Sequence, residues 1–227
     1  MTVLLVAHGT RHLTGARTVR ELADGVAARL GQPVAVAYAD VRGPTVAEAL
    51  ERLPGPVSLV PAFLASGYHV RVDIPAQVAA AGRAADVTIT PALGADAALL
   101  PALVDRLAEA GVREGDAVVL AAAGSSDAGA RAEAHAMARR LGRLLRGPVP
   151  VAWAATAEPA VADEVARLRR AGASRVAVAS WLLAPGLFAD RLHAAGADVV
   201  ASPLGGHPAV AAALAARVPL RVGAAVG

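Results

Sequence analysis

The chain of 227 residues contains no cysteine, no lysine and no asparagine. Without cysteine it can form no disulfide, no thiolate metal site and no cysteine-ligated iron–sulfur cluster. Without lysine it can have neither a Walker A loop nor a Schiff-base lysine for pyridoxal phosphate. We therefore expect a protein that uses no nucleotide and no iron–sulfur cluster, and the cytoplasm is its expected location.

Aromatic residues are also scarce, at 3% of the chain, although 56% of it is hydrophobic. The 22 basic residues are all arginines, and they are spread along the chain with few aromatics beside them, so we expect no nucleic-acid partner. No apolar run approaches the roughly 18 residues that span a membrane. Residues 1–7 are apolar but lack a basic leader, so we interpret them as a first strand rather than a signal peptide.

The two halves of the sequence are similar to each other. Gly9 and Gly124 end similar apolar segments, and they are 115 residues apart, as are Pro44 and Pro159. An internal duplication explains this spacing better than a solenoid, which needs a shorter period and more copies. We place the boundary near residue 113. This predicts a first lobe (1–113) that carries a metal site and a second lobe (114–227) that forms the opposite wall of a cleft.

Each half alternates apolar strand-like segments with segments of helical periodicity. Strands that are apolar on both faces are typical of parallel sheets, and alternation with helices is typical of α/β folds. We therefore predict two similar α/β lobes, each a four-stranded parallel sheet flanked by helices. The expected strands are 2–7, 34–39, 57–62 and 86–90, then 117–122, 149–154, 175–180 and 197–202.

Two histidines and one carboxylate follow strands of the first half. His8 comes directly after the first strand and before Gly9, whose missing side chain we expect to admit a ligand. His69 follows the third strand, and Asp40 ends the second. Because parallel strands end at one rim of the sheet, these groups should converge there. Imidazoles can bind Fe, Co, Ni, Cu or Zn or accept a proton, and a carboxylate can assist either task or simply cap the next helix.

These three polar groups occur only in the first half. The corresponding positions of the second half are Ala123, Ala155 and Phe188. A purely structural role would not require this asymmetry, so it favours a functional one. Of the remaining histidines, we expect His12 in a solvated turn and His135 and His193 on helices, and we leave open whether His207 faces the cleft.

At this point the residues resemble a known family. The turn from His8 to Arg11, the segment from Asp40 to Pro44 and the run from Pro61 to Pro75 are together similar to the class II tetrapyrrole chelatases, which are the sirohydrochlorin ferrochelatases and cobaltochelatases. The resemblance spans essentially the whole chain, because the duplicated two-lobe form is known there. It implies that His8 and His69 bind the incoming metal and assist its insertion, and that Asp40 stands where the family commonly has Glu.

The resemblance also implies the substrates. The metal would be a divalent ion (Fe2+ favoured, with Co2+ or Ni2+ as alternatives), and the macrocycle would be sirohydrochlorin, which is ringed with carboxylates. Arginines and helix N-termini suit such anions. We expect the substrate to lie against Thr10, Arg11, Arg42, Ser125 and Phe188, with Arg71 a further candidate and with a core role equally open for Phe188. We expect a monomer with no membrane partner.

Two other functions remain open from the residues alone. A metal-dependent lyase or hydrolase could use the same histidine pair, and its activity would persist without any tetrapyrrole. A two-lobe metal-binding protein would retain metal tightly and show no turnover. A chelatase needs weak, transient metal binding, which two imidazoles and one carboxylate with open positions favour.

Overall fold

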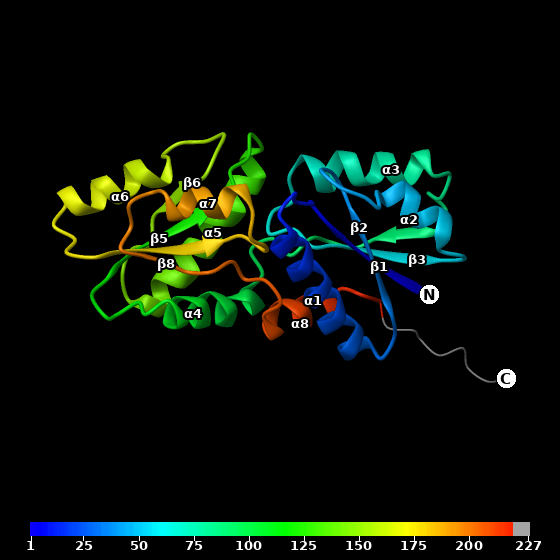
Figure 1. Ribbon diagram of the computed structural model, residues 1–227, viewed down its shortest axis with the longest axis horizontal. Helices are drawn as coiled ribbons and strands as arrows, with labels where there is room; N and C mark the ends of the chain where they lie inside the picture. The colour runs from blue at the N-terminus through cyan, green and yellow to red at the C-terminus, as the bar shows by residue number, and fades with distance from the viewer. Residues whose placement is uncertain (220–227) are drawn as a thin grey trace.

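The computed structural model describes residues 1–219 and contains two four-stranded parallel sheets with helices on both faces (Figure 1). This confirms the predicted fold class. Strand order in the first sheet is β2-β1-β3-β4, and the second sheet repeats it as β6-β5-β7-β8. The strands are β1 (Thr2–Ala7), β2 (Val34–Tyr38), β3 (Val57–Pro61) and β4 (Val87–Ile89), then β5 (Ala117–Ala122), β6 (Val151–Trp153), β7 (Val176–Trp181) and β8 (Val199–Val200).

Helices connect the strands in the predicted alternation. None of them within the described residues is both long and apolar enough to cross a bilayer. The helices that follow the first four strands are α1 (Leu13–Leu30), α2 (Val46–Arg52), the π-helical turn η1 (His69–Asp73) with α3 (Ile74–Ala80), and the 3-10 turn η2 (Ala97–Leu99) with α4 (Leu100–Glu109). Those of the second half are α5 (Ala128–Leu145), α6 (Val161–Arg170), α7 (Leu187–His193) and α8 (Pro208–Ala215).

Strand ends account for most differences from the expected ranges. β6 begins at Val151 rather than at residue 149, because Pro148 and Pro150 lack the N–H groups that a strand needs to pair on that side. β8 is reduced to two residues ahead of Pro203. Helix ends follow local rules: α1 ends at Gly31, which takes the left-handed conformation that glycine adopts most easily.

Side chains of the strands divide the core into three parts. Val3, Leu5 and Ala7 point to a cluster that also contains residues of the second sheet, whereas Leu4 and Val6 point to a cluster confined to the first lobe. This alternation is the two-residue period of a strand. The second sheet likewise has a separate outer cluster under α6 and α7. The two lobes therefore share one continuous apolar core on their inner face.

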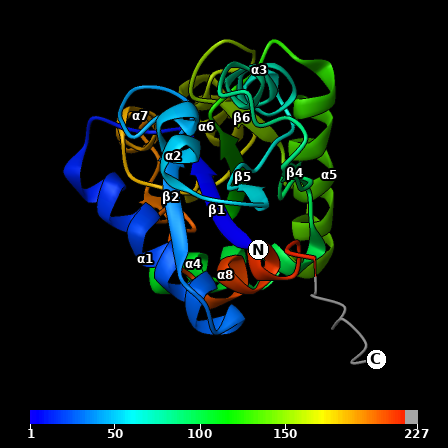
Figure 2. The same cartoon turned by 90° about the vertical axis from the view of Figure 1, so that its right-hand side faces the viewer.

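Two helices are exchanged across this shared core. α4, which precedes the expected boundary at residue 113, packs on α5 and β7 of the second sheet, and α8 packs on α1 of the first lobe. Figures 1 and 2 show α1, α4 and α8 in one layer beneath the sheets, with α2, α3, α6 and α7 above. The sequence repeat and the spatial lobes thus differ by these two helices. The division at 113–114 stays a prediction about the repeat.

The backbone after β1 repeats after β5. Gly9 has a φ of 103° and Gly124 a φ of 105°. A Cβ on Gly9 would lie 2.1 Å from the Asp40 carbonyl oxygen, and one on Gly124 would lie 1.8 Å from the Ala155 oxygen. The space beside Gly9 is therefore filled by the neighbouring loop and not left for a ligand, which corrects the sequence expectation. The close approach places Asp40 next to the turn that carries His8.

We expect Gly9→Ala to lower the free energy of unfolding by about 3 kcal/mol, since it adds both an overlap with the Asp40 carbonyl and an unfavourable φ. Gly31→Ala is the matched control, because its φ is 63° and no atom of the described residues lies within 4 Å of a Cβ built on it; this substitution should cost about 1 kcal/mol. Denaturant unfolding measures both. Equal losses would show that the approach of the two loops does not constrain Gly9.

Candidate functional site

The structure brings His8 and His69 together. His8 is the first residue after β1, and His69 begins η1 after β3, the strand that lies beside β1 in the sheet. The centroids of the two imidazole rings are 4.5 Å apart at an interplanar angle of 60°. Phe63 lies about equally far from both, at 6.4 Å and 6.3 Å between ring centroids. The adjacent strands deliver the convergence that the sequence predicted.

Asp73 fixes the orientation of His69. Its Oδ2 lies 2.5 Å from Nδ1 of His69, and both side chains are about 70% buried. The π-helical turn places the two residues four apart at its ends. In the neutral ring, a carboxylate that accepts the Nδ1–H selects the tautomer whose Nε2 carries no proton, which is the arrangement found behind most metal-binding histidines. His69 is therefore set to present Nε2 to a ligand.

His8 is held neutral by its surroundings. Burial lowers the pKa of its imidazole below the ordinary value, and the neighbouring His69 lowers it further. Its Nδ1 is completely buried and has no hydrogen-bond partner among residues 1–219. Nε2 is therefore the nitrogen that remains for a ligand on this ring as well. A neutral imidazole with one free nitrogen can bind a metal ion or accept a proton.

Asp40 lies beside His8 but does not contact it through its side chain. The Asp40 N–H donates to the His8 carbonyl at 2.9 Å, and the carboxylate accepts the N–H of Val41 at 2.6 Å. It does not cap α2, because Thr45 does so in a capping box with Glu48. The exposed carboxylate raises the pKa of His8, although less than burial lowers it. Asp40 is thus an electrostatic neighbour of the pair.

No group of three or more His, Cys, Asp or Glu residues within 1–219 is arranged to hold a metal ion. The candidate donor set is therefore the two imidazoles alone. Two ligands leave most of a metal's coordination positions to water or to another molecule, whereas structural metal sites close all four. The arrangement suits an ion that is held briefly and passed on.

The second lobe contacts this rim directly. Ser66 donates its N–H to Glu133 at 2.8 Å, and Arg71 pairs with Asp127 at 3.1 Å. Gly67 also lies against Ser125, since a Cβ built on it would be 3.6 Å from the hydroxyl. These contacts clamp the loop and η1, which carry His69, to the N-terminal end of α5. The rims at which the strands of both sheets end therefore meet.

The two lobes are also in direct contact beside His8. A Cβ on Gly186 would lie 2.9 Å from the hydroxyl of Thr10, and one on Gly15 would lie 2.3 Å from the carbonyl of Pro185. His12, exposed as expected, lies 3.7 Å from Asp190 of α7. The turn after β1 is thus packed directly against the turn after β7.

Several of the predicted substrate-binding residues make hydrogen bonds or ring contacts with other residues of the protein. The Thr10 hydroxyl accepts the N–H of His12, and the Ser125 hydroxyl accepts that of Asp127. Arg42 lies over the ring of Tyr38 and donates to the Thr10 carbonyl at 3.5 Å. Arg11 is exposed and has no ion pair within residues 1–219. Phe188 packs on the outer core of the second lobe beneath Arg191. Their substrate roles stay predictions.

The remaining histidines lie away from the pair. His135 is on the exposed side of α5 with its ring against Trp153, and His193 is the last, exposed residue of α7. His207 caps α8 by accepting the Ala209 N–H, and its Nε2 lies 3.1 Å from Asp105. These partners answer the question left open for His207, whose ring is engaged at a helix end rather than in the cleft.

Sequence reasoning missed two carboxylates. It gave no role to Asp73, although the four-residue spacing from His69 on a helical turn is a readable signal. It also missed Glu133, which binds the loop before His69 from the opposite lobe. Only the packing of α5 against the first lobe reveals that contact, so no local sequence pattern could have indicated it.

Comparison with known proteins now identifies the family. A family model described as CbiX matches residues 2–110 and again residues 117–219. The chain belongs to the CbiX family. The double match is the internal duplication. The sirohydrochlorin cobaltochelatase of Methanothermobacter thermautotrophicus is 35% identical over 77 residues, which are 32% of this chain and 54%, about half, of that relative. The resemblance to the class II chelatases is confirmed.

Solved structures share the CbiX-family fold. SirB from Bacillus subtilis, solved with Fe3+, matches with a TM-score of 0.77 at 22% identity, over 96% of this chain and 94% of its own. The structure of CbiX described as the terminal enzyme of sirohaem biosynthesis in denitrifying bacteria matches with a TM-score of 0.72 at 24% identity, over 96% and 100% of the two chains. The two-lobe architecture is therefore common to all three.

The lowered pKa of His8 predicts how stability depends on pH. Below about pH 6.5 this side chain takes up a proton in the unfolded chain more readily than in the folded protein, so it contributes a loss of stability on acidification. We expect the free energy of unfolding of the parent, followed from about pH 8 to about pH 5, to fall more steeply than that of His8→Gln. Parallel curves would contradict the buried, neutral state of His8.

Proposed function

We propose that this CbiX-family protein inserts a divalent metal ion into sirohydrochlorin without ATP, and that the ion is Fe2+, with Co2+ as the alternative. The observation that carries the proposal is the pair of imidazoles 4.5 Å apart, backed by Asp73 on one ring. Membership of the CbiX family and the relative named as a sirohydrochlorin cobaltochelatase support the same conclusion. Metal and macrocycle are both substrates here.

The chemistry needs a site that takes a hydrated metal ion, presents it to the macrocycle and accepts the pyrrole N–H protons. Neutral imidazoles can replace part of the ion's water shell, and two of them hold it more weakly than a closed site would. Because burial keeps His8 unprotonated at lower pH than an exposed histidine, its nitrogen stays available to a cation. Asp40, exposed beside His8, is the proposed acceptor of a released proton.

The macrocycle would lie where the two rims meet. Of the three candidate arginines, we propose Arg11 as the one that binds a substrate carboxylate. Its guanidinium is exposed and makes no ion pair within residues 1–219. Arg42 supports the turn through the Thr10 carbonyl, and Arg71 holds the lobes together through Asp127. Their proposed contribution is to position the rim.

An anaerobic insertion assay with sirohydrochlorin and Fe2+ or Co2+, followed by absorbance, tests the proposal. His8→Ala and His69→Ala should each lower the rate at least about 100-fold, because each removes one of two proposed metal ligands. His135→Ala and His193→Ala are the matched controls and should retain it. Asp73→Leu, which introduces the residue of the corresponding position 192, should weaken metal binding about 10- to 100-fold.

Several outcomes would contradict the proposal. Parental activity of His8→Ala would show that the imidazole pair is not the site. Activity on substrates without a tetrapyrrole would favour the metal-dependent lyase or hydrolase, and tight metal retention without turnover would favour a metal-binding protein. An insertion rate with Co2+ well above that with Fe2+ would show that Co2+ is the metal substrate.

A further inference from the structure

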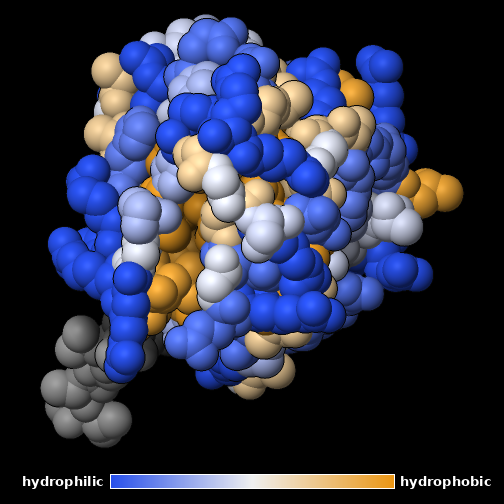
Figure 3. All heavy atoms as spheres, turned by 90° about the vertical axis from the view of Figure 1, so that its left-hand side faces the viewer, coloured by the Kyte–Doolittle hydropathy of each residue, from blue (hydrophilic) through white to orange (hydrophobic). Residues whose placement is uncertain are grey.

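The second lobe has a cavity of about 660 Å³, widely open to solvent, at the end that faces away from the histidine pair. It lies between the C-terminal part of α5, the segment 147–150 and the end of α6. α5 begins at the rim beside Ser125, and at 1.5 Å per residue its 18 residues span about 27 Å. Figure 3 looks onto this end of the molecule and shows apolar hollows between hydrophilic residues. The cavity is therefore separate from the site at the rims.

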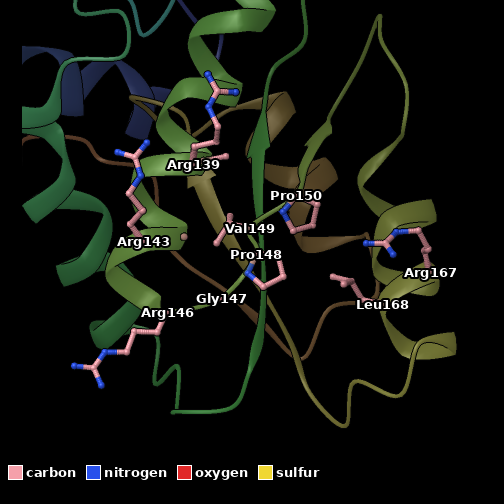
Figure 4. A pocket seen from close by; sticks show the side chains of 11 residues that line it. Arg139, Arg143, Arg146, Gly147, Pro148, Val149, Pro150, Arg167 and Leu168 are labelled. Carbon is pink, nitrogen blue, oxygen red and sulfur yellow. The ribbon is translucent and has the colours of Figure 1, made fainter.

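Three arginines lie on the α5 side of an apolar segment in this cavity, and a fourth lies on its α6 side (Figure 4). Figure 4 shows Arg139, Arg143 and Arg146 projecting from α5 and its end, and Arg167 reaching in from α6. Arg167 is neutralised by the buried carboxylate of Glu164 at 2.6 Å. The other three take part in no ion pair within residues 1–219, so they leave the rim positively charged. The floor consists of Pro148, Val149, Pro150 and Leu168 with Ala138.

The duplication shows that these charges are a property of one lobe. α1 and α5 both have 18 residues and correspond at an offset of 115, so the equivalents of the three free arginines are Asp24, Ala28 and Gly31. The scaffold therefore needs no arginine at any of the three positions. Arginine at these three positions is therefore a feature of the second lobe, whereas α1 has its last-turn arginine at Arg29.

Arg146 supplies an independent sign of function. It ends α5 in the left-handed conformation, with φ 58° and ψ 29°, where Gly31 ends α1 at φ 63° and ψ 25°. A side chain is unfavourable in this conformation, and glycine is the ordinary choice. A strained backbone that persists where glycine would fit is a signal that the side chain itself is used.

We propose that this cavity is a second ligand site, which binds a small organic polycarboxylate with an apolar body. Its volume is that of a small-molecule pocket. Guanidinium groups bind carboxylates with paired hydrogen bonds, and the proline- and valine-lined floor takes the apolar body. No aromatic side chain lines the cavity for base stacking, so a single nucleic-acid strand does not fit it.

Titration with a naphthalene tetracarboxylate, followed by calorimetry and fluorescence, tests this proposal on the whole chain. The parent should bind one molecule at this site, and Arg139→Gln, Arg143→Gln and Arg146→Gln together should weaken binding at least about tenfold. The matched control replaces Arg20, Arg29 and Arg52, exposed arginines of the first lobe, by Gln. It removes the same charge and should change the affinity less than about twofold.

Further arms separate the sources of affinity. Citrate, which has carboxylates but no apolar body, should bind at least about tenfold more weakly. His8→Ala should bind the probe like the parent, because the sites are separate. Arg146→Gly should raise the melting temperature by about 2 °C while it weakens binding, so a loss of affinity there cannot come from unfolding.

Absence of saturable binding of the naphthalene tetracarboxylate would overturn the proposal, as would an equal loss of affinity in the two triple variants. Citrate binding as tightly as the naphthalene probe, or a loss of probe binding in His8→Ala, would overturn it as well. None of these outcomes depends on insertion activity. The second site and the proposed chelatase function can therefore fail independently.

Discussion

The position of the site depends on the apolar core that the two sheets share. Residues of alternate strand positions from both halves bury together on the inner face, and the exchanged helices α4 and α8 cover that core in the layer beneath the two sheets (Figure 1). Separating the lobes would expose this apolar surface to water, which costs about 25 cal/mol of free energy for each Å² exposed. The rims at which the strands end are therefore held face to face, and the loops after β1 and β3 meet the loops after β5 and β7.

Within this frame the same scaffold serves two purposes. Gly9 and Gly124 have matching backbones, which shows that the loop geometry is common to both halves. The side chains on these loops differ between the halves. Imidazoles occupy positions 8 and 69 of the first half, where the second has Ala123 and Phe188. The second half has instead gained carboxylates that clamp the first, Asp127 on Arg71 and Glu133 on the Ser66 N–H. One lobe holds the histidine pair, and the other positions the segment that carries His69.

The sequence was sufficient for the fold and for the histidine pair, because both follow from local rules. Buried apolar strands predict parallel sheets, and a parallel sheet brings the residues after adjacent strands to one rim. Contacts between elements could not be predicted in this way. The exchange of α4 and α8 depends on which apolar faces meet in three dimensions. The commitment of Arg42 to Tyr38 and the Thr10 carbonyl, and of Asp40 to the Val41 N–H, depends on side-chain conformations that no periodicity encodes.

The central claim is that the duplication produced one site between two rims rather than two sites. Titration of sirohydrochlorin into the whole chain, with the histidine-pair variants His8→Ala and His69→Ala beside the parent, measures this most directly. The account predicts one macrocycle bound per chain at the facing rims, with a metal-dependent spectral change that both variants lose. Two equivalent macrocycles per chain, each with that spectral change, would contradict it.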